Sequence, residues 1–158
     1  MSRARALQGR LLAAACGAAL VASSFVPLWA TYRVPGLGLF APETVYRNAW
    51  GAYGAGMQLA LVLTVVAVLL ALFSGAPRLS VPHKGPLLFG LCLTATLSML
   101  WEAAAGPQGS SNPNGYGISR GVLLFAGMGL ACGMTYGGYL TMRPAEPDPR
   151  TDRADRGE

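Results

Sequence analysis

The stretch AYGAGMQLALVLTVVAVLLALF, residues 52–73, decides the fold class of this chain. It contains no charged residue, and it lies within a longer uncharged interval that runs from Asn48 to Pro77. A bilayer core of about 30 Å requires roughly 20 apolar residues in an α-helix, because each residue rises about 1.5 Å. Residues 52–73 meet this requirement, so we predict a transmembrane helix here.

Three more stretches have the same length and apolar character. They are residues 11–30, 86–105 and 121–142, and among them only the second contains an acid, Glu102. The segments between them are too short for a separate soluble domain. We therefore predict an all-α, polytopic membrane protein with one domain, a bundle of four transmembrane helices over residues 11–142.

The composition supports a membrane protein. The 158 residues are 53% hydrophobic and 12% charged, whereas soluble domains carry about 25% charged residues. The first ten residues are basic and precede an apolar stretch, as in a secretory signal. The uncharged run from Leu11 to Tyr32 is longer than the usual apolar core of a signal, however, so we expect an uncleaved anchor.

Basic residues predict the orientation, because cytoplasmic segments carry an excess of Arg and Lys. One side of the predicted bundle receives nine of the 12 basic residues, and the other side receives only Arg33, Arg47 and Arg120. We therefore predict a basic cytoplasmic N-terminus over residues 1–10 and a cytoplasmic tail over residues 143–158. The mixture of Arg, acids and Pro in that tail predicts disorder. The scarcity of Lys and Ile indicates a high-GC bacterial genome and hence the bacterial inner membrane.

Aromatic residues occur at the predicted outer ends of the spans. Trp29, Trp50 and Trp101 lie there, together with several tyrosines, and amphipathic rings favour the lipid headgroup level. We therefore expect an outer aromatic belt. The outer connection over residues 31–51 is interpreted either as an interfacial segment or as a partner-binding loop with exposable aromatic residues. The second outer connection, residues 106–119, is rich in turn formers and predicts a flexible loop.

Glu102 is the one ionisable residue within a predicted span, and an intramembrane acid is a candidate functional residue. Gly90, Thr94, Ser98 and Glu102 are spaced four apart and share one helix face. Two interpretations stay open. Glu102 could form a structural ion pair with Arg33, Arg47 or Arg120, or it could serve a substrate or proton path along Thr94 and Ser98.

Gly129, Gly133 and Gly137 remove side chains along one stripe of the last span and allow another helix to approach closely. The first span offers small residues at Ala14, Ala18 and Ala22. The stripe therefore predicts either packing between the first and last spans or a seam with another chain. Such a seam would form a homo-oligomer or a larger membrane protein complex.

Catalytic and cofactor chemistry finds little support. Cys16, Cys92 and Cys132 each lie alone in a different span, and His83 is the one histidine. A nucleophile, a base and an orienting acid cannot be assembled from so few polar residues. We expect no enzyme activity and no cofactor. The lipid bilayer is the expected partner. We attribute the net charge of +5 to the membrane topology and to attraction to anionic lipid. No nucleic-acid partner is expected.

Several short motifs carry a resemblance to a known group. They are Pro27-Leu-Trp29, Asn48-Ala-Trp50, a Pro/Arg-rich inner loop, and Gly137-Gly-Tyr-Leu-Thr-Met-Arg143. With them the chain resembles small four-helix membrane proteins of high-GC, actinobacterial-type bacteria, a group without an assigned activity. The resemblance implies topology and envelope location. Small multidrug exporters are disfavoured because the first span lacks an acid, and a claudin-like protein because residues 31–51 lack Cys.

Two functions are therefore expected. The leading one is a non-catalytic accessory or scaffold subunit of a cell-envelope complex, which associates through Gly129, Gly133 and Gly137 or through the outer loop. The alternative is a small oligomeric transporter or channel that uses Glu102 and the Thr94/Ser98 stripe.

Overall fold

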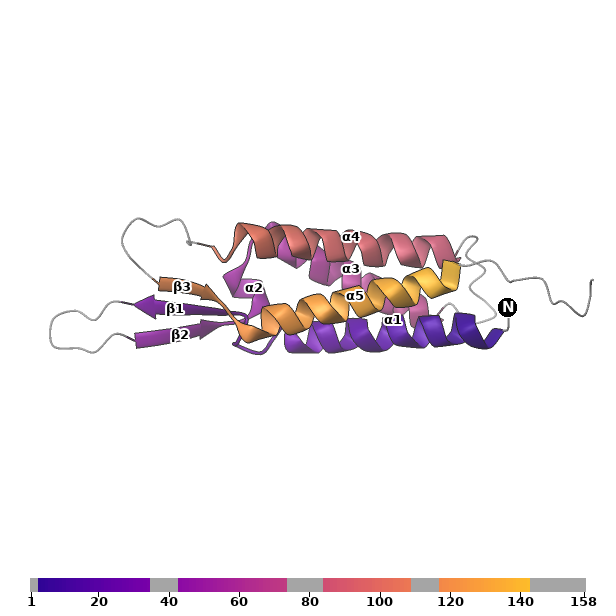
Figure 1. Ribbon diagram of the computed structural model, residues 1–158, viewed down its shortest axis with the longest axis horizontal. Helices are drawn as coiled ribbons and strands as arrows, with labels where there is room; N and C mark the ends of the chain where they lie inside the picture. Colours follow the sequence, from indigo (N-terminus) through magenta and orange to yellow (C-terminus); the bar gives the residue numbers. More distant parts are fainter. Residues whose placement is uncertain (1–2, 35–42, 74–83, 109–116, 143–158) are drawn as a thin grey trace, which may run out of the picture.

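Four long helices lie side by side along the long axis of the molecule (Figure 1). The structure is a computed structural model that describes residues 3–34, 43–73, 84–108 and 117–142. The helices are α1 (Arg3–Ser23), α3 (Ala55–Phe73), α4 (Lys84–Ala105) and α5 (Val122–Met142). All four are long and apolar enough to cross a membrane, which confirms the predicted four-helix bundle. The predicted cytoplasmic tail, residues 143–158, lies outside the described residues, as does His83.

Large apolar side chains point away from the bundle along its length. Leu59, Val62, Leu97 and Phe125 each expose more than half of their surface. A stable bundle leaves such side chains outside only where the surroundings are apolar, as lipid tails are. The exposed residues therefore agree with a multi-pass membrane protein.

Helix α1 lies earlier in the chain than the predicted span over residues 11–30. It begins at Arg3 and ends at Ser23, so most of the N-terminus predicted as a separate segment is helical. Arg, Ala, Leu and Gln favour helix, and residues 3–10 contain no Pro, so the single Gly9 weakens the helix by only about 1 kcal/mol without ending it. The helix ends because the hydroxyl of Ser24 donates to the carbonyl oxygen of Val21 at 2.6 Å, and Pro27 soon follows.

A three-stranded antiparallel sheet projects from one end of the bundle, and sequence reasoning missed it (Figure 1). Its strands are β1 (Ala30–Val34), β2 (Glu43–Arg47) and β3 (Gly117–Arg120), in the order β2-β1-β3. Both outer connections contribute to it, residues 31–51 and residues 106–119. We call this end of the bundle the sheet end, and we call the end where α1 begins and α5 finishes the basic end.

The strands have two different faces, because successive side chains alternate. Tyr32 pairs with Val45 on one side and with Ile118 on the other, and these three side chains are half-buried. The opposite face carries Thr31, Arg33, Thr44, Tyr46 and Ser119, which are mostly exposed. We call this second set the polar face of the sheet.

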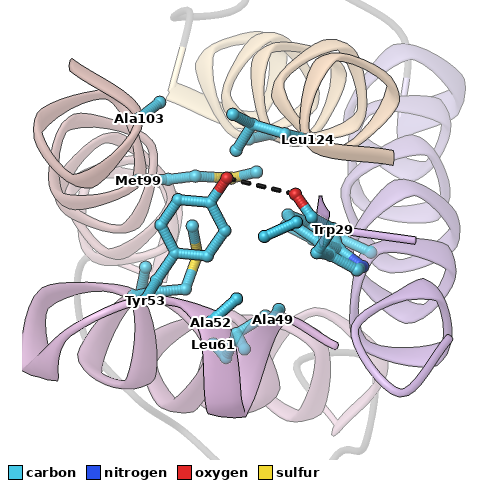
Figure 2. Packing of buried hydrophobic residues seen from close by; sticks show 13 residues of the cluster. Trp29, Ala49, Ala52, Tyr53, Leu61, Met99, Ala103 and Leu124 are labelled. Carbon is cyan, nitrogen blue, oxygen red and sulfur yellow. Dashed lines mark hydrogen bonds between the residues drawn. The ribbon is translucent and has the colours of Figure 1, made fainter. Parts of the chain in front are cut away.

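The sheet end is packed around Trp29, contrary to the predicted aromatic belt (Figure 2). Trp29 is 0% exposed and Tyr53 is 1% exposed, within a cluster that includes Met99 and Leu124. Among the three tryptophans, Trp101 is exposed as a belt residue would be, at 74%. A tryptophan is buried readily when its N–H has a partner, and Trp29 Nε1 donates to the Ser23 carbonyl oxygen at 2.6 Å. The belt prediction is therefore wrong for Trp29.

Candidate functional site

The carboxylate of Glu102 binds the beginning of helix α3. Its Oε2 accepts a hydrogen bond from the backbone N–H of Gly54 at 3.0 Å, and its Oε1 accepts one from the backbone N–H of Gly56 at 3.0 Å. The first N–H groups of a helix have no partner within the helix, and the helix dipole favours a negative charge there. Glu102, near the end of α4, therefore fastens α4 to the start of α3.

Two glycines make this approach possible. A Cβ atom on Gly54 would lie 3.1 Å from Glu102 Oε1, and one on Gly56 would lie 2.5 Å from the same oxygen. A side chain at Gly56 would therefore displace the carboxylate. The sequence Gly54-Ala-Gly56 was not recognised as part of a site, although paired glycines at a helix start with one acid elsewhere are a usable signal for it.

Among the described residues, Glu102 forms no ion pair with any of the three arginines expected to pair with it, because its two oxygens accept hydrogen bonds from backbone amides. The Arg120 guanidinium donates to the Ala104 carbonyl oxygen at 3.2 Å, where a cation complements the end of α4. The Arg47 guanidinium lies 5.5 Å from the centre of the Tyr32 ring. Arg33 is exposed in β1. Glu102 and Arg120 each bind a helix end instead of each other.

We expect Glu102→Ala to lower the free energy of unfolding by about 1–3 kcal/mol, because it leaves two partly buried amides without their acceptor. Glu102→Gln keeps one acceptor oxygen and should lower the free energy of unfolding by less than Glu102→Ala does. Thermal unfolding in mild detergent measures both. Gly56→Ala should also destabilise the protein, since it displaces the carboxylate without removing its charge. Wild-type stability in Glu102→Ala would contradict the assigned role.

Trp29 and Tyr53 connect the sheet to the helices. The Trp29 carbonyl oxygen accepts a hydrogen bond from the Tyr53 hydroxyl at 3.2 Å (Figure 2). It also accepts one from the backbone N–H of Gly121 at 2.8 Å. The backbone N–H of Trp29 donates to the Arg47 carbonyl oxygen at 3.1 Å. One residue thus joins β2, the segment before α3 and the start of α5. Burial raises the pKa of Tyr53 to about 12, although the charge of Arg120 lowers it, so this hydroxyl stays protonated and keeps donating at neutral pH.

The Thr94/Ser98 stripe does not line the interior of the bundle. Thr94 is exposed, and its hydroxyl donates to the Gly90 carbonyl oxygen of its own helix at 2.9 Å. Ser98 is half-buried. The polar contact inside the bundle instead joins Thr96 of α4 to Thr135 of α5, whose hydroxyl oxygens lie 2.8 Å apart. Spacing from Glu102 did not reveal this pair, because neither residue shares its stripe.

The three glycines of the predicted stripe on α5, Gly129, Gly133 and Gly137, have different surroundings. A Cβ on Gly137 would lie 2.7 Å from both the Ala13 nitrogen and the Gly9 oxygen of α1, and one on Gly133 would lie 3.0 Å from Cys16 Sγ. Gly129 is exposed and has open space around it. Gly133 and Gly137 therefore serve packing between α1 and α5.

The surface that α1 offers to these glycines differs from the expected one. It consists of Gly9, Ala13 and Cys16, whereas the expected set was Ala14, Ala18 and Ala22. Ala18 and Ala22 are exposed. The predicted pairing of the last span with the first span is therefore correct at Gly133 and Gly137, but the residues of α1 that face these glycines differ from the predicted ones.

At the sheet end, the charged groups of Glu102 and Arg120 bind backbone groups at helix ends. Both Glu102 oxygens are engaged by amides. Within the described ranges, no three His, Cys, Asp or Glu side chains gather closely enough to hold a metal ion. No protein-family model matches this chain, and no curated protein matches it.

Proposed function

We propose that the protein is a non-catalytic accessory subunit of a cell-envelope membrane complex, and that it presents the polar face of its sheet to a partner protein. The observation that carries the proposal is that two connections far apart in the chain form a single sheet fixed to the bundle through Trp29. A surface held this firmly needs little ordering when it binds, and ordering is a large part of the unfavourable free energy of association.

The polar face has the features of a recognition surface. Tyr46, on the edge strand β2, is 53% exposed, and tyrosine is among the residues that dominate protein interfaces. Strands β2 and β3 are the edges of the sheet, and edge strands have free backbone groups that can pair with another chain. In the predicted orientation, with both termini in the cytoplasm, this surface faces the outer side of the membrane.

The transporter alternative has no observation in its favour. Thr94 is exposed on the side of the bundle, and the Glu102 carboxylate is bound by two amides. The glycines proposed for an intermolecular seam are used within the chain at Gly133 and Gly137. We therefore place the association surface on the sheet rather than on the glycine stripe.

Site-specific photo-crosslinking tests the proposal in native membranes. A photoreactive amino acid at Tyr46 should give a protein adduct of one defined mass. The same amino acid at Tyr136, which is 57% exposed on α5, is the matched control and should give no such adduct. The protein identified by mass spectrometry should co-purify with the wild type and be lost with Tyr46→Ala.

Three outcomes would contradict the proposal. Equal adducts from Tyr46 and Tyr136 would indicate non-specific contact, and a missing adduct at Tyr46, Thr44 and Ser119 would remove the interface. A stable Glu102→Gln variant that loses a proton- or cation-coupled flux would favour the transporter instead.

A further inference from the structure

The polar face of the sheet carries one charged side chain, Arg33, on the central strand β1. The other two arginines of the strands are engaged: the Arg47 guanidinium lies over the Tyr32 ring, and the Arg120 guanidinium donates to the Ala104 carbonyl oxygen. Arg33 is exposed, and among the residues that the structure describes none holds it by a hydrogen bond or an ion pair. Within that part of the chain, its guanidinium is available to another molecule.

Hydroxyl groups and a glycine surround Arg33 in the register of the sheet. Thr44 of β2 pairs with it on one side, and Gly117 of β3 pairs with it on the other. Thr31 and Ser119 pair with each other two positions along the same face, within about 5–8 Å of Arg33 by sheet geometry. A glycine within a strand lets another chain approach the backbone closely. The guanidinium therefore has hydroxyl groups around it and no side chain on one flank.

This arrangement fits a carboxylate. A planar guanidinium binds both oxygens of a carboxylate through two parallel N–H donors, and an ionised carboxylate accepts further hydrogen bonds. The hydroxyl of the exposed Thr44 can supply one of them. Tyr46, diagonal to Arg33 on the same face, adds an aromatic surface beside the charge. An Asp or Glu side chain of a partner protein would use all of these groups.

The charge of the sheet end also favours an acidic partner. The three strands contain three arginines and one acid, Glu43, which pairs with Val34 rather than with Arg33. The sequence that connects the strands adds no charge, since residues 35–42 and 109–116 contain no charged residue. A second copy of this chain would bring the same excess of arginine, and like charges oppose association. The complementary surface is therefore acidic and belongs to a different protein.

Arg33 lies beyond the end of the helices. Ala30 pairs with Arg47 and Arg120, and Arg120 contacts the end of α4, so Ala30 marks the end of the bundle. Strand β1 runs away from the bundle (Figure 1), and its three residues from Ala30 to Arg33 span about 10 Å. A headgroup layer is roughly 5–7 Å thick on each side of the bilayer. This position favours a protein carboxylate over a lipid phosphate.

We propose that the partner of the polar face is a protein with an acidic surface, and that one of its Asp or Glu side chains binds Arg33 as a bidentate ion pair with Thr44 donating to the same carboxylate. This carboxylate site rests on the partner-binding function proposed above and specifies the chemistry of that partner. Arg33 then selects the partner, because a neutral or basic surface would leave the guanidinium without a counter-charge.

Photo-crosslinking from position 46 in native membranes measures the contribution of Arg33. Arg33→Gln should lower the yield of the protein adduct by roughly tenfold, the size of one charge-assisted hydrogen bond, and Arg33→Glu should lower it further. Arg33→Lys keeps the charge without the planar fork and should lie between the wild type and Arg33→Gln. Arg47→Gln is the matched control, since it removes an exposed arginine from the other face of the same sheet, and it should leave the yield unchanged.

Two further measurements identify the group that binds Arg33. The partner peptide in the adduct, sequenced by mass spectrometry, should contain an Asp or Glu. Changing that acid to Arg should abolish the adduct with the wild type and restore it with Arg33→Glu. Raising NaCl from about 0.05 M to about 0.5 M should lower the yield with Arg33 in place and change it little in Arg33→Gln, because salt screens exposed charges. The salt dependence with Arg33 in place is informative even if a variant fails to fold.

Three results would overturn the carboxylate site. An undiminished adduct in Arg33→Glu would remove it while leaving the partner-binding function of the sheet in place. A phospholipid adduct from a photoreactive residue at Thr44, lost in Arg33→Gln, would assign Arg33 to the membrane surface. The absence of any protein adduct with Arg33 in place would remove both the partner-binding function and the carboxylate site.

Discussion

Replacing Trp29 by alanine is expected to lower the free energy of unfolding by about 3–5 kcal/mol, the range for removing a large buried aromatic side chain. The indole is 0% exposed, and a Cβ on Gly127 of α5 would lie 2.5 Å from its Cη2 atom. Neighbours that are already in contact on every side cannot readily fill the space. Thermal unfolding in detergent, followed by near-ultraviolet circular dichroism, measures the loss.

Two further variants separate packing from hydrogen bonding at this position. Trp29→Phe keeps a large ring but removes the donor to the Ser23 carbonyl oxygen. It should therefore lower the free energy of unfolding by less than Trp29→Ala does. Trp101→Ala, at a ring that is 74% exposed, should change stability by about 0.5 kcal/mol or less. Equal effects at Trp29 and Trp101 would contradict the assignment of Trp29 to the core.

Helix existence could be predicted from the sequence because lipid imposes a simple rule. A bilayer requires about 20 apolar residues per helix, and residues 52–73 and 121–142 lie within a few residues of α3 and α5. The start of α1 was missed because charged residues such as Arg5 and Arg10 continue a helix as readily as apolar ones. The requirement for about 20 apolar residues identifies the part of a helix that lies in lipid. It does not predict at which residue the helix begins or ends outside the lipid.

The sheet could not be predicted from the same reasoning. Its strands have only four or five residues, and they form by pairing β1 with two segments on either side of it in space. Thr31, Tyr32 and Val45 favour strands, but short runs at the ends of apolar spans are equally typical of interfacial segments. The site around Glu102 depended on the same missing information, because its partners are backbone amides that no side-chain pattern reveals.

Gly137→Ala should destabilise the bundle, whereas Gly129→Ala should not. A methyl group at Gly137 would lie 2.7 Å from backbone atoms of Gly9 and Ala13. Backbone cannot rotate aside as a side chain can, so α1 and α5 must separate, and overpacking of this kind lowers the free energy of unfolding by about 1–3 kcal/mol. Unfolding in a detergent titration compares the two variants directly.

Gly129→Ala is the matched control on the same helix and in the same sequence repeat. Open space surrounds Gly129, and alanine favours helix over glycine by about 1 kcal/mol, so its stability should be unchanged or slightly higher. Gly133→Ala, which meets the movable Cys16 side chain at 3.0 Å, should fall between the two. If Gly129→Ala instead left stability intact but reduced the mass of a native complex, the exposed part of the stripe would be a seam with another chain, and association would use α5 as well as the sheet.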